Sequence, residues 1–273
     1  MSQKAKNQPQ GNIPQSGSQS NSADFMYEDL ELSLEGMLKS GMHFGHKKSR
    51  WNPKMKPYIF ATRNEIHIID LEKSLAKFQK ALEFMREIVK NGGKILIVGT
   101  KPQAKGVVEA AARSIDMPFV VNRWLGGTFT NFFQIKKRIK YLNDQEIKLG
   151  QGDFEKYTKY EQSRMKKEID RMNEKMGGIK RMENLPQAIL VTDVKENGPA
   201  VLESRNQKIP VIGIVDTNVD PDPIDYPIPG NDDALSSLKY ILGIVVKSLK
   251  DAKNQAIAEK LTKDKEKKQL SPK

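Results

Sequence analysis

Short apolar runs alternate with amphipathic segments over much of the chain. Five runs are predicted to be strands: residues 95–98, 119–121, 188–191, 211–215 and the weaker 226–228. The first four are almost continuously hydrophobic, which is typical of strands covered on both faces of a parallel sheet. Helical spacing of apolar residues predicts helices over residues 73–91, 103–114, 199–206 and 232–250. The alternation predicts an α/β domain around a five-stranded parallel sheet.

The alternation fails between the second and third predicted strands, where no strand pattern occurs. Apolar residues recur there at intervals of three and four, at Phe132, Ile135, Ile139 and Leu142 and again at Met165, Ile169, Met172, Met176 and Ile179. This spacing forms a heptad seam, and two glycines near residue 151 divide it. We expect an antiparallel coiled-coil hairpin over residues 131–183, inserted in the sheet domain. It carries 14 basic and 9 acidic residues, and we expect it to contact RNA or protein.

The two ends of the chain differ in composition from the predicted domain. Residues 1–24 are rich in Gln, Asn, Ser, Gly and Pro, which predicts a disordered extension and fits neither a secretory signal nor a transit peptide. Residues 251–273 end in a lysine-rich sequence and are predicted to be a flexible tail. The single sheet domain is expected over residues 25–130 and 184–250.

Composition excludes several classes of protein. The chain contains no cysteine, so disulfide scaffolds, thiolate metal sites and cysteine nucleophiles are excluded. Its apolar runs are too short to span a bilayer. We therefore expect a cytoplasmic protein without a membrane partner.

The formal net charge is +12, and its distribution is more informative than its size. Residues 39–63 contain no acidic residue but seven basic and four aromatic ones: Lys39, Lys47, Lys48, Arg50, Lys54, Lys56 and Arg63, with Phe44, Trp51, Tyr58 and Phe60. Glycines and prolines break any helix here, so we interpret the segment as a basic loop held in one shape. Such a loop suits contacts to RNA phosphates and bases. The plainer alternative is a surface loop whose aromatic side chains only anchor it to the core.

Motifs for nucleotide binding are incomplete. The motif GxxxxGK[ST] does not occur, because Lys105 has neither the Gly before it nor the Ser or Thr after it that the motif requires. The motif GxGxxG does not occur either. The amides of Gly126 and Gly127 precede a helix and can cradle an anion. Two glycines at a turn are, however, more often required by the backbone geometry of the turn than by a bound mononucleotide. A nucleotide-binding α/β enzyme of unknown substrate is kept as the alternative function. Three carboxylates lie near the end of a predicted strand: Asp193, Glu196 and Glu203. No His, Lys or glycine-rich loop is defined beside them, so the sequence supports an enzymatic role for them only weakly.

Candidate metal ligands do not form a recognised set. His43 and His46 are three residues apart without a third ligand nearby in the sequence, so a packing or hydrogen-bonding role is preferred. The acidic patch with the best composition for a hard cation is Asp216, Asp220, Asp222 and Asp225. Its prolines and its departure from the EF-hand order favour a rigid turn. We predict no catalytic residue, no metal site and no cofactor.

Four segments carry a resemblance to a known family: GMHFGHKKSRWNPKMKPYIFATRNEIHIIDLEKS, ILIVGTKPQA, NRWLGGTFTN and IVDTNVDPDPIDYPIPGNDDA. In this order and spacing they resemble the bacterial small-subunit ribosomal protein S2 family, over residues 34–247. The sequence departs from the pattern at Asn197, Gly198 and Pro199, where a more regular helix start is expected. The resemblance implies a Rossmann-like, flavodoxin-type sheet with an inserted coiled-coil hairpin, in a component of the small subunit that is not an enzyme.

The resemblance also implies partners and contact residues. It implies binding to 16S rRNA, support for docking of the mRNA-binding ribosomal protein S1, and contacts with neighbouring small-subunit proteins, without a small-molecule substrate. RNA contact carries over to the residues that match FGHxxxxWNPKM, namely Lys47, Lys48, Arg50, Trp51, Asn52, Lys54 and Lys56, and further to Arg63, Lys101, Arg123 and Trp124. Trp51 is expected either to stack on a base or to seal the loop to the core. A free-standing coiled-coil adaptor is the second alternative.

Overall fold

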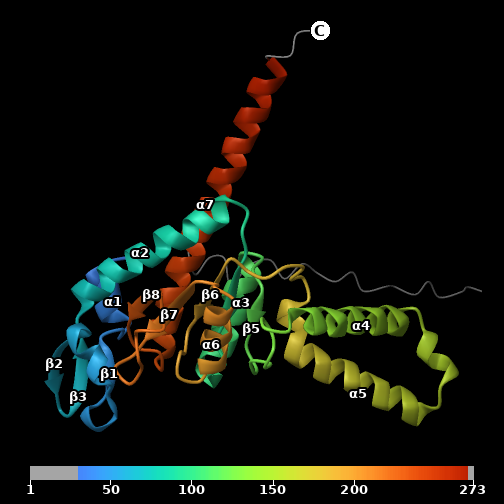
Figure 1. Cartoon of the computed structure of the whole chain (residues 1–273), viewed down its shortest axis with the longest axis horizontal. Coiled ribbons are helices and arrows are strands. Elements are labelled where there is room, and N and C mark those ends of the chain that lie inside the picture. The colour runs from blue at the N-terminus through green and yellow to red at the C-terminus, as the bar shows by residue number, and fades with distance from the viewer. Residues whose placement is uncertain (1–29, 270–273) are drawn as a thin grey trace, which may run out of the picture.

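A five-stranded parallel sheet forms the centre of the computed structural model, which describes residues 30–269 (Figure 1). Its order is β5-β4-β6-β7-β8. The strands are β4 (Ile95–Val98), β5 (Phe119–Val120), β6 (Ala188–Val191), β7 (Val211–Val215) and β8 (Tyr226–Pro229). Every residue of β4, β6 and β7 is buried, as the continuous apolar runs predict. The predicted α/β class with a five-stranded parallel sheet is confirmed.

Helices cover both faces of this sheet. The helices outside the inserted segment are α1 (Leu34–Lys39), α2 (Leu71–Lys90), α3 (Pro102–Ser114), α6 (Gly198–Asn206) and α7 (Leu235–Gln269). Ile95 and Ile97 of β4 join the core formed with α2, α3 and α7. Leu96 and Val98 face the opposite way, into a second core formed with α6 and the root of the inserted segment. The alternation of neighbouring residues between two cores explains why each strand is apolar throughout.

A second, smaller sheet lies beside α1 and α2 and has the antiparallel order β1-β3-β2. Its strands are β1 (Phe44–Lys47), β2 (Ile59–Arg63) and β3 (Ile66–Ile69), and the 3₁₀ helices η2 (Lys48–Arg50) and η3 (Pro53–Tyr58) lie between β1 and β2. The sequence predicts a loop here, and the structure differs. β1 is half exposed and β2 is exposed at four of its five residues, so neither an apolar run nor an alternating pattern marks them as strands. Asn64 and Glu65 join β2 to β3 with positive φ angles of 49° and 61°, as a tight two-residue hairpin turn requires.

The inserted segment is a pair of helices that leaves the large sheet as an arm (Figure 1). Helix α4 (Phe132–Gly150) and helix α5 (Lys159–Met176) are joined through η4 (Asp153–Lys156), and η5 (Gly177–Ile179) returns the chain to the sheet. Leu142, Phe154 and Ile169 form a buried cluster between the helices. Thr158 and Glu161 start α5 with reciprocal hydrogen bonds, a capping box.

Helix α7 is longer than its apolar pattern predicts. It continues to Gln269, into the segment for which the sequence predicts a tail. Residues 251–269 contain neither Gly nor Pro and are rich in Ala, Lys and Glu, which favour helix on a solvated surface. The expectation for residues 1–24 lies outside the described residues. Within residues 30–269, no helix combines the length and apolar character that a membrane span needs.

Candidate nucleic-acid interface

The surface formed by residues 44–63, here called the basic segment, carries exposed cations that have no ion-pair partner among the side chains that the structure describes. Five of its basic side chains are exposed and form no ion pair with any other residue of 30–259: Lys47, Lys48, Arg50, Lys56 and Arg63. The backbone beneath them is fixed. The amide of Asn52 donates to the Thr217 carbonyl at 2.7 Å, and Met55 is fully buried in the second core. The cations are thus presented on a scaffold attached to the large sheet.

The aromatic residues of the basic segment divide between the core and solvent. Trp51 is half-buried, with its ring centroid 5.3 Å from that of His67, and Tyr58 packs against the second core. Phe60 is 77% exposed and Phe44 is 48% exposed. Two aromatic side chains therefore anchor the segment, and two are exposed to solvent. Phe60 is an open aromatic face, although it is not among the contact residues that the resemblance implies.

Lys54 differs from its neighbours because it is engaged by the acidic turn. Its ammonium lies 2.6 Å from Asp220 and 2.5 Å from Asp222. Hydrogen bonds to these carboxylates raise the pKa of Lys54. Asp225 instead accepts a hydrogen bond from the Val211 amide. Asp220 and Asp222 thus share the Lys54 ammonium, whereas Asp225 binds a backbone amide, so all three carboxylates are engaged within the chain.

Lys101 also lies among carboxylates, at the carboxyl ends of β4 and β6, where the strand order reverses and an open α/β sheet forms its crevice. Its ammonium is 2.8 Å from both Asp232 and Asp233 and 3.8 Å from Asp193. Burial alone would lower the pKa of Lys101, but the carboxylates raise it above its ordinary value. Burial raises the pKa of Asp232 to about 7. Ligands of open α/β sheets bind at such a crevice, but an excess of carboxylates disfavours a phosphate.

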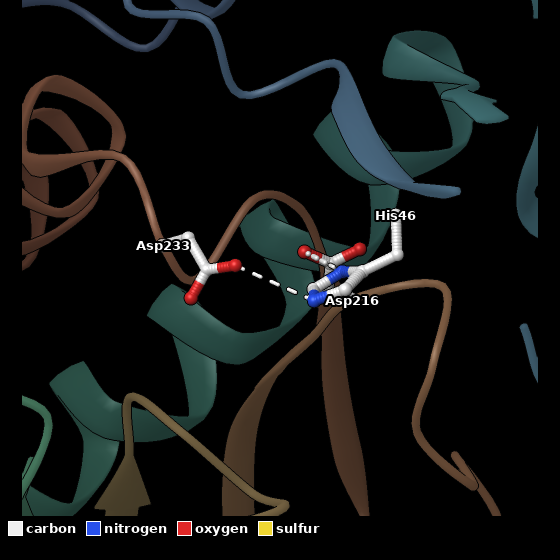
Figure 2. A group of neighbouring side chains, drawn as sticks. All are labelled: His46, Asp216 and Asp233. Atoms are coloured by element: carbon white, nitrogen blue, oxygen red, sulfur yellow. Dashed lines mark ion pairs between the residues drawn. The ribbon is translucent and has the colours of Figure 1, made fainter. Parts of the chain in front are cut away.

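His46, on β1 of the small sheet, lies beside Asp216 and Asp233 (Figure 2), and Asp233 also pairs with Lys101. Its Nδ1 lies 3.0 Å from Asp216 and its Nε2 3.4 Å from Asp233. The contact with Asp216 raises the pKa of His46. One ligand atom from each of these three residues lies within 4.8 Å of the others, an arrangement that suits a divalent cation. The sequence does not reveal this group, because His46 lies about 170 residues before Asp216 and about 190 before Asp233; His43 is not part of the group.

The loop that contains Gly126 and Gly127 does cradle an anion, and that anion is the chain's own Glu203. The Glu203 carboxylate accepts hydrogen bonds from the Trp124 indole at 3.0 Å and from the amides of Gly127 at 2.8 Å, Phe129 at 2.9 Å and Thr130 at 3.2 Å. Burial would raise the pKa of Glu203, but these hydrogen bonds hold it below its ordinary value. The donors that a nucleotide phosphate would need are therefore occupied.

The family model described as Ribosomal protein S2 matches residues 37–252, which is most of the chain. The chain belongs to the ribosomal protein S2 family. Membership implies a protein of the small ribosomal subunit that is associated with the ribosome and its RNA. The resemblance predicted from four separate motifs is confirmed.

In this member of the ribosomal protein S2 family, the predicted contact residues fall into two groups. Seven are exposed or half-buried at the surface without an ion pair among the described residues: Lys47, Lys48, Arg50, Trp51, Lys56, Arg63 and Arg123. Four are used within the chain: Lys54 and Lys101 by carboxylates, Asn52 by the Lys54 amide, and Trp124 by Glu203 in the core. The family resemblance implies RNA contact for residues of both groups, and only their partners in the fold separate them.

Proposed function

We propose that this protein is a structural component of the small ribosomal subunit that binds 16S rRNA through the exposed cations of the basic segment. The observation that carries the proposal is the set of five exposed cations on a fixed backbone that have no ion pair with the described residues. Lysine and arginine on a rigid surface recognise the phosphates and the shape of folded RNA. The acidic crevice at Lys101 and the occupied cradle at Glu203 weigh against the alternative of a nucleotide-dependent enzyme.

The finer description of the fold belongs to the same proposal. Counted along the chain, the order of the large sheet is 2-1-3-4-5, which supports a flavodoxin-type, Rossmann-like domain over residues 25–130 and 184–250. The three-and-four spacing of the buried residues supports a coiled-coil hairpin over residues 131–183. Support for docking of ribosomal protein S1 comes from the family resemblance.

The experiment is a charge reversal with a matched control. We expect the Lys47→Glu/Lys48→Glu/Arg50→Glu variant to be lost from the small-subunit fraction of a sucrose gradient, because three phosphate contacts become repulsive. The control reverses three exposed lysines elsewhere, Lys90→Glu/Lys195→Glu/Lys239→Glu, and should incorporate normally. Circular dichroism checks that both variants fold. Wild-type occupancy of the first variant would show that the basic segment is not the RNA interface.

A further inference from the structure

One flank of the α4–α5 arm carries a second row of unpaired cations, distant in sequence from the basic segment. Arg164, Lys167, Arg171 and Lys175 recur at intervals of three, four and four, which places them on one side of α5. Two adjoining shallow hollows, of about 400 and 440 Å³, follow this flank and share Glu168 and Arg171. We call them together the arm groove.

Aromatic and basic residues line both parts of the arm groove. Arg138 and Tyr141 of α4 line the second hollow, and Tyr160 lines the first. Tyr160 is 78% exposed and Tyr141 is 45% exposed. From Tyr160 to Lys175 the groove extends about 22 Å along α5, at about 1.5 Å per residue.

The carboxylates of the arm do not neutralise this groove. Glu146 pairs with Lys180 at 2.6 Å, Asp153 with Lys156 at 3.8 Å, and Glu161 caps its own helix. Glu168 is the one acidic residue lining the two hollows. The groove cations form no ion pair with any described residue. The flank therefore keeps a local excess of positive charge.

We infer that the arm groove is a second RNA-binding face, which holds the phosphate backbone of the same RNA that the basic segment contacts. This inference rests on the proposed function. A row of lysines and arginines over about 22 Å matches successive phosphates, and exposed tyrosines offer faces for stacking on bases. A protein partner fits less well, because the cores of protein interfaces are depleted in charged residues as a class, whereas the groove has four cations along α5 alone.

A tethered cleavage reagent tests which flank faces RNA. The chain contains no cysteine, so a single introduced cysteine directs an iron chelate to one position. Glu168→Cys places the chelate in the arm groove, and Asp170→Cys places it on the opposite flank after the same loss of one carboxylate. Ser49→Cys, in the basic segment, is the reference. After reconstitution into small subunits, hydroxyl-radical cleavage of 16S rRNA is read by primer extension.

We expect strong cleavage from positions 49 and 168 and weak cleavage from position 170. Cleavage from position 49 but not from position 168 would contradict RNA binding by the arm groove and would leave the proposed function standing. A chelate at 168 that is shielded from solvent without cutting RNA would also overturn it, because a protein would then cover the groove. Absence of cleavage from both 49 and 168 would overturn the two proposals together.

Binding of the full-length protein to a 16S rRNA transcript provides a second test. We expect Arg164→Glu/Arg171→Glu to weaken binding at least about tenfold, since two phosphate contacts become repulsive. The control Lys159→Glu/Lys166→Glu makes the same charge change on the other flank of α5 and should alter affinity less than about twofold. Equal losses in both variants, at unchanged helicity, would contradict a specific groove.

Discussion

The basic segment and the crevice at Lys101 both have cations next to glycine and proline turns, but the cations are exposed in the first and paired with carboxylates in the second. In the basic segment, Lys48 and Arg50 are exposed, and the surrounding sequence contains no carboxylate. In the crevice, Lys101 faces Asp193, Asp232 and Asp233, which lie 92 to 132 residues further along the chain. A cation is available to RNA only where the fold brings no carboxylate to it.

The largest effect is expected at Lys101. We predict that Lys101→Met lowers the free energy of unfolding by about 2–3 kcal/mol, because it leaves buried carboxylates without their cation. The value lies below that of a fully buried pair, since 16% of the Lys101 side chain remains exposed. Urea denaturation followed by circular dichroism measures it.

Two further variants sharpen this prediction. Adding Asp232→Asn to Lys101→Met should restore part of the lost stability, because it removes one of the uncompensated carboxyl groups. Lys48→Met, in the basic segment, should leave the urea midpoint unchanged. Equal effects of Lys101→Met and Lys48→Met would remove the distinction between the two regions.

A slightly smaller effect is expected at Glu203, which fills the cradle of the glycine loop. We predict that Glu203→Gln lowers the free energy of unfolding by about 1.5–3 kcal/mol at pH 7, because an amide replaces a carboxylate that accepts hydrogen bonds from several N–H groups. The native pKa lies below the ordinary value of 4.5, so the carboxylate stabilises the fold above that pH. This contribution disappears as the pH falls through the native pKa.

The difference between wild type and Glu203→Gln should therefore shrink in acid, as urea denaturation at pH 7 and at pH 3 will show. Glu196→Gln is the matched control, since Glu196 is an exposed carboxylate just before the same helix. It should change stability by less than about 0.5 kcal/mol. A difference at Glu203 that does not vary with pH would contradict the role of its charge.

The smallest effect on stability and on RNA affinity is expected at Lys54, which lies in the basic segment but is paired with carboxylates, as Lys101 is. Lys54→Ala should leave both the urea midpoint and the affinity for 16S rRNA nearly unchanged, because its exposed ion pairs with Asp220 and Asp222 contribute little. Filter binding measures the affinity. A loss equal to that of Lys48→Ala would show that the ion pairs open to release Lys54 for RNA.

The sequence predicts the large sheet well because its strands are buried on both faces and therefore continuous in apolar residues. It does not reveal β1 and β2, because both are short and neither contains a buried residue that would produce an apolar pattern. The site divides in the same way. The exposed cations stand out because they are local, whereas the partners of Lys54, Lys101 and Glu203 come from distant segments that only the fold brings together.

The most direct test of the distinction between free and engaged cations is the salt dependence of 16S rRNA binding in two matched double variants. Lys47→Ala/Lys48→Ala removes two unpaired cations, and Lys54→Ala/Lys73→Ala removes two that are already paired, Lys73 with Asp70 at 3.1 Å. The slope of log affinity against log salt should fall by about two in the first variant and stay unchanged in the second, since each phosphate contact contributes about one unit. Equal changes of slope in the two variants would contradict the account.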